Sequence, residues 1–255
     1  MAADRLGLFV MVDGLDGAGK GVILDGLRDY VMYVLKKNVF ELEKHWLNHG
    51  DHPELSDMIA TDAILSSEPT SVGIGKAIRD ELISDSHNRK YPAAAVAQAY
   101  SLDRLILYSR VSLPALRVGK WIFQSRGVPT SLVYQPIQSD MMQGVKLPVD
   151  YLLNLEGNKL ALENSPDLLI IPTVKDVAAL AKRLAMRSKK DHAIFETTPF
   201  QERVKAVYES QWFRELFEKR GTVVKYLDAG VSVEHSRSEA VRILGEFLKS
   251  RGIAK

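Results

Sequence analysis

A glycine-rich segment near the N-terminus constrains the fold of this chain more than any other feature. It reads Gly14-Leu15-Asp16-Gly17-Ala18-Gly19-Lys20-Gly21, and it joins the apolar run Leu8–Val12 to a segment with helical spacing, Lys20–Lys37. Glycines let a backbone wrap around phosphates with its N–H groups pointing inward, and the start of a helix adds a favourable dipole. Lys20 would reach the β- and γ-phosphates of ATP. The segment therefore predicts an ATP-binding loop, and the alternative is a plain glycine-rich turn.

Apolar runs that alternate with helical patterns predict a parallel α/β sheet. The runs expected as strands are Leu8–Val12, Ala63–Leu65, Trp121–Phe123, Asp167–Ile171 and Thr222–Leu227. The segments expected as helices are Lys20–Lys37, Ile74–Ile83, Ala93–Leu116, Val177–Met186 and Glu239–Leu248. We therefore expect residues 1–255 to form one doubly wound α/β domain of the P-loop NTPase type, with a five-stranded parallel sheet flanked by helices.

Two segments depart from this alternation. Residues 37–62 are polar and are expected to be an insert. Its His45, His49, Asp51 and His52 include an i, i+4 pair with metal-ligand spacing, but a polar surface explains them better. Residues 145–165 are apolar and irregular, and Gly157-Asn158 suggests a hairpin turn there.

The composition excludes several classes of protein. With 46% hydrophobic and 26% charged residues, the chain has enough apolar material for a core. It has no cysteine, which excludes disulfide scaffolds and thiol catalysis and suits a reducing cytoplasm. The formal net charge of +2 gives no reason to expect a nucleic-acid partner, and no apolar stretch is long enough to cross a membrane.

Ordered motifs follow the loop over nearly the whole chain. In chain order they are Glu68-Pro69-Thr70 with Ile74–Arg79, Tyr100-Ser101-Leu102-Asp103-Arg104, Ser125-Arg126 with Thr130–Gln135, Pro166-Asp167-Leu168, and Arg183, Arg187, Phe195-Glu196 and Phe200–Tyr208. Together with Gly14–Lys20, their order and spacing resemble the thymidylate kinase family. The resemblance implies transfer of the γ-phosphoryl group of ATP to dTMP with Mg²⁺ as cofactor, a lid at about residues 183–196, and a homodimer.

The resemblance also implies a binding site for the base and sugar of dTMP. Tyr100 would stack on the thymine ring, and Arg104, one helical turn later, would donate to a base carbonyl. Ser131 would contact the base edge, and Gln135 belongs to the same substrate-binding set. Tyr134 would press on the sugar where a 2′-hydroxyl would sit.

A second set of residues is implied for the phosphates. Arg126 would grip the monophosphate, because a guanidinium fork suits two phosphate oxygens. Arg79 is a further candidate for the same phosphate, and Asp16 would meet the sugar hydroxyl or a metal-bound water. Arg183 and Arg187 would neutralise the transferring phosphoryl group as the lid closes. The expected catalytic residues are thus Lys20, Arg126, Arg183 and Arg187.

Each of these side chains also has a purely structural interpretation. Tyr100 and Tyr134 could simply pack in the core. Arg104 could form a surface ion pair with Asp103. The lid arginines could lie on a solvated helix face.

Four positions depart from the family pattern, and two of them concern the metal. Gly21 and Ser125 replace a hydroxyl and a carboxylate that usually serve Mg²⁺, while Ser67 and Gly127 replace an arginine and an aromatic residue. A carboxylate such as Asp13 or Asp16 is then the candidate metal ligand. The pattern fits an active thymidylate kinase, and the alternatives are a catalytically silent nucleotide-binding protein and a kinase for another nucleoside or nucleotide.

Overall fold

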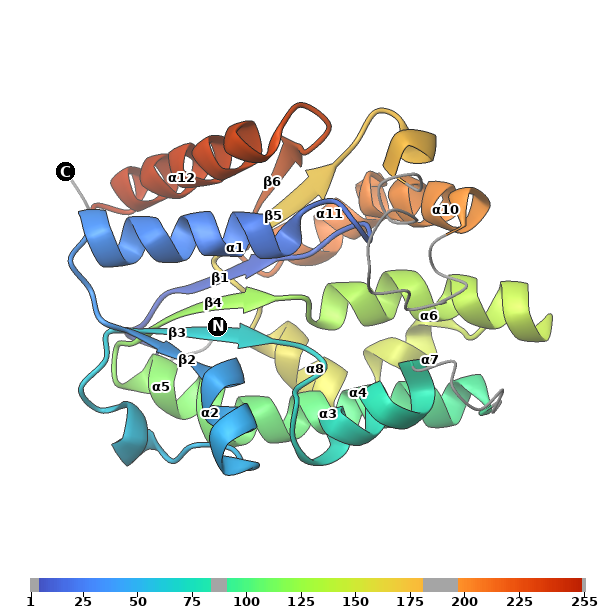
Figure 1. Cartoon of the computed structure of the whole chain (residues 1–255). Helices are drawn as coiled ribbons and strands as arrows, with labels where there is room; N and C mark the ends of the chain where they lie inside the picture. Colours follow the sequence, from blue (N-terminus) through green and yellow to red (C-terminus); the bar gives the residue numbers. More distant parts are fainter. Residues whose placement is uncertain (1–4, 84–90, 181–196, 254–255) are drawn as a thin grey trace.

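The computed structural model describes residues 5–83, 91–180 and 197–253. A parallel sheet lies at its centre, with helices on both sides (Figure 1). Its strands are β1 (Phe9–Val12), β2 (Val39–Glu41), β3 (Ala63–Ser67), β4 (Trp121–Ser125), β5 (Leu168–Thr173) and β6 (Val223–Asp228). They lie in the order β2-β3-β4-β1-β5-β6, and every neighbouring pair is parallel. The predicted α/β class is confirmed, but the sheet has six strands where the sequence predicted five.

The missed strand is β2, at one edge of the sheet. It has three residues, and all of them are only half-buried. Central β1, by contrast, is fully buried and reads Phe-Val-Met-Val, which is typical of a strand covered on both faces. A short and partly polar edge strand produces no such apolar run, which is why the sequence assigned this region to an irregular insert.

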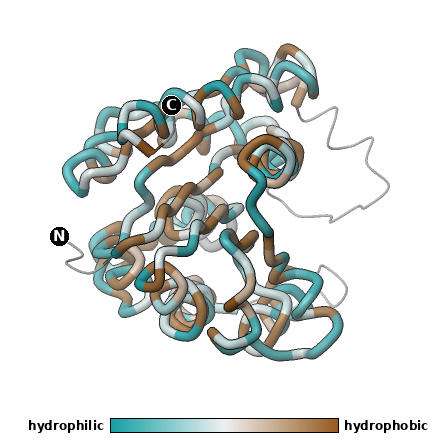
Figure 2. Tube along the Cα trace, turned by 90° about the vertical axis from the view of Figure 1, so that its left-hand side faces the viewer, coloured by the Kyte–Doolittle hydropathy of each residue, from teal (hydrophilic) through white to brown (hydrophobic). Residues whose placement is uncertain are grey.

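Helices flank the sheet on both sides. Their bounds are α1 (Lys20–Asp29), α2 (Leu42–His49), α3 (Gly73–Ala77), α4 (Ala93–Leu107), α5 (Leu113–Arg117), α6 (Val128–Gln143), α7 (Val149–Leu153), α8 (Glu156–Glu163), α10 (Thr198–Tyr208), α11 (Gln211–Glu218) and α12 (Val233–Ser250). Shorter turns of other helical types are η1 (Tyr30–Val34), η2 (Leu55–Met58), η3 (Ile78–Ile83) and η4 (Tyr108–Ser112). Helices α1 and α12 lie side by side on one side of the sheet, and α4, α5 and α8 cover the other (Figure 1). Hydrophilic and hydrophobic residues alternate along these helices (Figure 2), as expected where one helix face packs on a sheet.

The predicted helices agree with the structure in place and differ in detail. The segment 93–116 is helical throughout, but it passes from α4 through a π-helical turn, η4, into α5. Of the predicted helix 177–186, residues 177–180 are helical and the remainder lies outside the described residues.

The hairpin turn predicted at Gly157-Asn158 is wrong. Both residues lie inside helix α8 and are buried. The glycine serves a close helix contact: a Cβ built at position 157 would lie 1.8 Å from the carbonyl oxygen of Ser101 in α4. The backbone N–H of Gly157 also donates to the Ser101 hydroxyl at 2.9 Å. A glycine can mark such a close approach as well as a turn, even where an asparagine follows it.

The insert at residues 37–62 is ordered structure rather than a polar loop. It contains β2, α2 and η2, and Trp46 of α2 is buried with its ring against His52, edge to face. The backbone carbonyl of His52 accepts a hydrogen bond from Arg110 of η4. No helix in the described part of the chain is long and apolar enough to cross a lipid bilayer.

Burial of His52 gives the insert a pH-dependent stability. Burial, reinforced by nearby Arg110, lowers the pKa of His52 to about 4. The unfolded chain takes up a proton near pH 6.5 while the folded chain does not, so stability falls as the pH drops from 6.5 towards 4.

We expect the parent protein to lose about 2 kcal/mol more unfolding free energy between pH 7 and pH 5 than a His52→Gln variant does. Urea denaturation at both pH values measures this, with His235→Gln on exposed α12 as the control. Equal losses in parent and His52→Gln would contradict it.

Candidate active site

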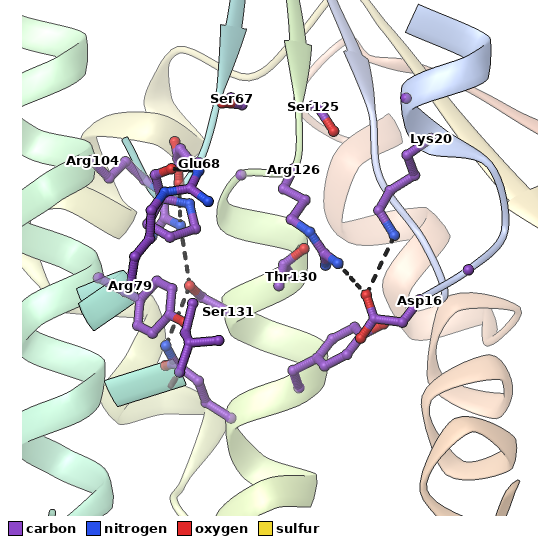
Figure 3. A pocket seen from close by; sticks show the side chains of 18 of the residues that line it. Asp16, Lys20, Ser67, Glu68, Arg79, Arg104, Ser125, Arg126, Thr130 and Ser131 are labelled. Atoms are coloured by element: carbon purple, nitrogen blue, oxygen red, sulfur yellow. Dashed lines mark hydrogen bonds and ion pairs between the residues drawn. The ribbon is translucent and has the colours of Figure 1, made fainter. Parts of the chain in front are cut away.

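A pocket of about 650 Å³ opens where the parallel strands β1, β3 and β4 end. Ligand sites in open α/β sheets lie outside the carboxyl ends of the strands, so this is the expected place for one. The loop after β1 forms one wall, the segment after β3 forms the opposite wall, and Arg126 after β4 lies between them (Figure 3).

The loop after β1 has the conformation that its glycines allow. Gly14 has a φ of 154° and lies against Pro172, where a Cβ would come within 2.9 Å of the Pro172 carbonyl oxygen. Gly19 has a φ of 79° and immediately precedes α1, which begins at Lys20. The free N–H groups of the first helical turn therefore lie beside the pocket, where they favour an anion.

Two cations share one carboxylate at this end of the pocket. Asp16 pairs with the guanidinium of Arg126, and its Oδ1 lies 3.7 Å from Nζ of Lys20. Burial alone would raise the pKa of Asp16, but Arg126 and Lys20 lower it below its ordinary value. Burial and the charge of Arg126 together lower the pKa of Lys20 to about 7. The lowered pKa of Lys20 reflects its burial and two cations held close together, so an anion entering the pocket would be attracted to them.

Lys20 and Arg126 are held by the backbone around them. Nζ of Lys20 donates to the carbonyl oxygens of Gly14 at 2.9 Å and Leu15 at 2.6 Å. Arg126 has a φ of 62°, an uncommon conformation for a residue other than glycine, and it forms the sharp turn between β4 and α6. That turn brings its side chain towards the glycine loop.

The buried carboxylate of Asp13 joins three parts of the site. Its Oδ1 accepts from the backbone of Gly14 at 2.8 Å, the hydroxyl of Thr130 at 2.6 Å and the hydroxyl of Tyr208 at 2.8 Å. Its Oδ2 accepts from the backbone N–H of Thr130 at 3.1 Å. Asp13 thus caps helix α6 and fixes it, together with α10, to the start of the loop.

The far end of the pocket contains a buried arginine network. Arg104 is 1% exposed, and its Nη2 contacts Glu68 Oε2 at 2.6 Å and the Ser131 hydroxyl at 3.1 Å. Its Nη1 donates to Oδ1 of Asn158. Glu68 also accepts from Gln124 at 3.0 Å, and burial raises the pKa of Glu68 to about 7 although Arg104 opposes this rise.

Some polar atoms in this network have no partner among the described residues. These are Nε of Arg104, Oε1 of Gln124 and Oε1 of Gln135, all of them buried. Gln135 is 6% exposed, and its Nε2 is 3.4 Å from the Ser131 hydroxyl. Unpaired buried polar atoms are costly, and the side chains of Arg104 and Gln135, which carry one such donor and one such acceptor, both line the pocket.

The segment after β3 is fixed by α4. Asp103 accepts from the backbone N–H of Thr70 at 2.8 Å and from its hydroxyl at 2.6 Å. Arg79 donates to the carbonyl oxygens of Pro69 and of Thr70, the latter at 3.0 Å. Arg79 lines the pocket, but these contacts occupy part of its guanidinium.

The structure brings the predicted substrate-binding residues into one pocket. The residues that line it are Asp16, Arg79, Tyr100, Arg104, Arg126, Ser131, Tyr134 and Gln135. Of the predicted loop residues, Gly17, Gly19, Lys20 and Gly21 also line it, whereas Leu15 and Ala18 are buried in the core. The catalytic candidates Arg183 and Arg187, and the lid at 183–196, lie outside the described residues. The roles of all these residues stay predictions.

The structure also bears on the purely structural interpretations of these side chains. Arg104 is not a surface residue paired with Asp103, because it is buried against Glu68. Tyr134 packs on Phe200 and also lines the pocket. Burial raises the pKa of Tyr100 to about 12, so its hydroxyl stays protonated.

Several residues of the site carried no role in the sequence-based prediction, among them Glu68, Asp103 and Asn158. Glu68 and Asp103 stood within quoted motifs, so the motif order could have revealed them. Asn158 lies 54 residues from Arg104 in the chain, and no sequence pattern connects the two.

The histidine cluster of the insert forms a set of packing contacts. His45 lies 3.3 Å from Asp51 and stacks on His49, with 4.3 Å between the ring centroids. Among the described residues, no group of three or more His, Cys, Asp or Glu side chains could hold a metal ion.

Comparisons with known proteins agree with this geometry. The family model described as thymidylate kinase matches residues 54–240. A thymidylate kinase of Ruthia magnifica is 25% identical over 239 residues, covering 93% of this chain and 97% of its own. One from Ligilactobacillus salivarius is 27% identical over 245 residues, covering 95% and 99%. The solved structure of Candida albicans thymidylate kinase superposes with a TM-score of 0.61 at 15% identity, covering 98% of this chain and 94% of that one, which supports a shared fold.

Proposed function

The chain belongs to the thymidylate kinase family, and from that premise we propose that it transfers the γ-phosphoryl group of ATP to dTMP, giving ADP and dTDP. One observation carries the proposal. A single pocket has the glycine loop with Lys20 at one end, Arg104 and Ser131 at the other, and Arg126 between them (Figure 3). Gln135, whose Nε2 is 3.4 Å from the Ser131 hydroxyl, lines the same pocket. Those are the chemical requirements of a phosphate donor, an acceptor phosphate and a base, in that spatial order.

The unpaired atoms at the base end favour a keto pyrimidine. Thymine presents an N3–H donor beside an O4 acceptor, and these complement the Gln135 carbonyl and the Arg104 N–H groups. Cytosine presents an acceptor and a donor at the same two positions, so it would leave both protein groups unpaired. Such mismatches cost far more than a missing methyl group does. Tyr100, which also lines the pocket, would supply an aromatic face for the ring.

The cations at the phosphate end would bind the two substrates and neutralise the transferring group. Positioning and charge neutralisation provide most of the catalysis in phosphoryl transfer. Asp16 holds Lys20 and Arg126 close together before any phosphate enters. Negatively charged phosphates would replace this carboxylate as the partner of both cations and would raise the pKa of Lys20 from its low value. Asp16 would then be released towards the sugar or a metal-bound water.

The oxygens present in the pocket fit a Mg²⁺ ion held mainly by phosphates and water. Asp16 and the hydroxyl of Ser125 line the pocket, whereas Asp13 is absent from its lining, so Asp16 and Ser125 are the groups that would hold it. Oxygen ligands suit Mg²⁺, which commonly keeps several waters. When bound, the ion would neutralise charge on the phosphates.

The oligomeric state and the location of the protein complete the proposal. The family resemblance favours a homodimer, and α4 carries an exposed leucine, Leu102, that such an interface would cover. The absence of cysteine from the sequence is compatible with a cytoplasmic enzyme.

An ADP-release assay across a set of acceptors tests the proposed reaction. We expect Mg²⁺-dependent turnover with dTMP, lower rates with dUMP, and at least about 100-fold lower kcat/KM with dCMP, because cytosine mismatches Gln135 and Arg104.

Lys20→Ala should lower kcat by about 100-fold or more, since it removes a charge that neutralises the transferred group. Lys44→Ala, on the exposed face of α2, is the control. Full activity in Lys20→Ala would defeat the assignment of that lysine.

The second candidate function is nucleotide binding without efficient turnover, which Gly21 and Ser125 favour. A Cβ at position 21 would meet nothing within 4 Å, so a larger side chain fits there. We expect Gly21→Thr with Ser125→Asp to raise kcat about 3- to 10-fold by restoring metal ligands. Gly21→Val with Ser125→Asp has the same shape without the hydroxyl and should gain less. Equal rates in the two double variants would count against the role of the missing hydroxyl.

A further inference from the structure

Helix α8 contacts Arg104, at the base end of the pocket, through one buried side chain, Asn158. It is fully buried, and its Oδ1 accepts from Nη1 of Arg104. Its Nδ2 donates to the carbonyl oxygen of Leu152 at 2.8 Å, where α7 meets α8. Because one end of the amide faces a cation and the other faces a carbonyl, only one orientation of the group satisfies both.

Asn158 holds the end of the guanidinium that the other contacts leave free. Glu68 and Ser131 both contact Nη2, so together they fix only one corner of the planar group. Asn158 fixes the opposite corner, Nη1. A guanidinium held at both nitrogens cannot turn about its Cδ–Nε bond, and the direction of its remaining N–H groups is then set.

The neutrality of Asn158 also matters. Glu68 already provides one carboxylate for the charge of Arg104, and burial weakens the tendency of Glu68 to ionise. An amide oxygen orients the guanidinium without adding a second buried negative charge, which would be costly to desolvate.

The backbone places Asn158 at a fixed distance from Arg104. The neighbouring Gly157 lets α8 approach α4 so closely that any Cβ there would collide with Ser101, and its N–H is bonded to the Ser101 hydroxyl. Ser101 lies one turn before Arg104 on α4. Asn158 therefore meets Arg104 from a rigid support.

We propose that Asn158 is a positioning residue for pyrimidine recognition: it orients Arg104 so that the free N–H groups of the guanidinium meet a carbonyl at position 4 of the base. The inference rests on the proposed function, because Arg104 must contact the base of the acceptor. It goes beyond that function by assigning discrimination to a residue of α8 that is absent from the residues lining the pocket.

Calorimetry with dTMP, and competition binding with dCMP, test this without requiring turnover. Asn158→Leu keeps the approximate volume and removes both hydrogen bonds, so we expect the Kd for dTMP to rise about tenfold or more. The Kd for dCMP, which lacks that carbonyl, should change less than about threefold, because it gains nothing from the oriented Arg104. Asn158→Asp keeps the acceptor that faces Arg104, so it should retain more affinity for dTMP than Asn158→Leu does, although its second buried negative charge lowers the stability of the fold. If Asn158→Leu does not fold, Asn158→Ser makes the same comparison.

The control variant is Asn164→Leu, at the end of the same helix. It removes a similar hydrogen bond, from the side-chain amide of Asn164 to the backbone carbonyl of Leu160 at 2.9 Å. It should leave both Kd values unchanged. Unchanged dTMP binding in Asn158→Leu, or equal losses for dTMP and dCMP, would overturn the inference and leave the proposed function standing. A parent protein that binds no dTMP would overturn both. A parent that binds dTMP without turnover would refute the phosphotransfer alone, and the Kd comparison would still decide the role of Asn158.

Discussion

The buried carboxylate of Asp13, at the end of central β1, is the contact on which the geometry of the pocket depends. It accepts hydrogen bonds from the first glycine of the loop, from the first turn of α6 and from the hydroxyl of Tyr208 in α10. Arg126 lies two residues before the start of α6, and Lys20 follows the loop as the first residue of α1. The anchored carboxylate of Asp13 therefore fixes the backbone that carries the two cations, whose side chains meet at Asp16. A buried acceptor with several donors is rigid because losing any one of them leaves an unpaired polar group.

Buried polar contacts also fix the base end of the pocket, where the charge of Arg104 is paired inside the protein. Arg104 is buried with Glu68, and its remaining contacts come from α6 and α8 rather than from solvent. A buried ion pair adds little net stability, but it fixes direction. The donor and acceptor that remain unpaired there are thus held ready for a ligand, and recognition would cost little reorganisation.

Much of this arrangement was predictable from the sequence, and the exceptions have physical reasons. Long apolar runs and the glycine loop identified five strands and the pocket wall, because parallel strands carry their loops to one edge. Strand β2 was missed because its three residues are too few, and too evenly half-buried, to produce a recognisable pattern of apolar and polar residues. Gly157 was interpreted as a turn because sequence alone cannot tell a sharp bend from a close helix contact. The contact between Asn158 and Arg104 joins residues distant in the chain, so only the folded structure shows it.

The most direct test of this account is a crystal structure of the protein with ADP and dTMP bound. We predict that the ADP phosphates lie on the loop at residues 14–21, the phosphate of dTMP lies on Arg126, and the thymine ring lies on Tyr100 with its O4 facing Arg104. A dTMP molecule bound outside this pocket, or a base turned away from Arg104, would contradict the account.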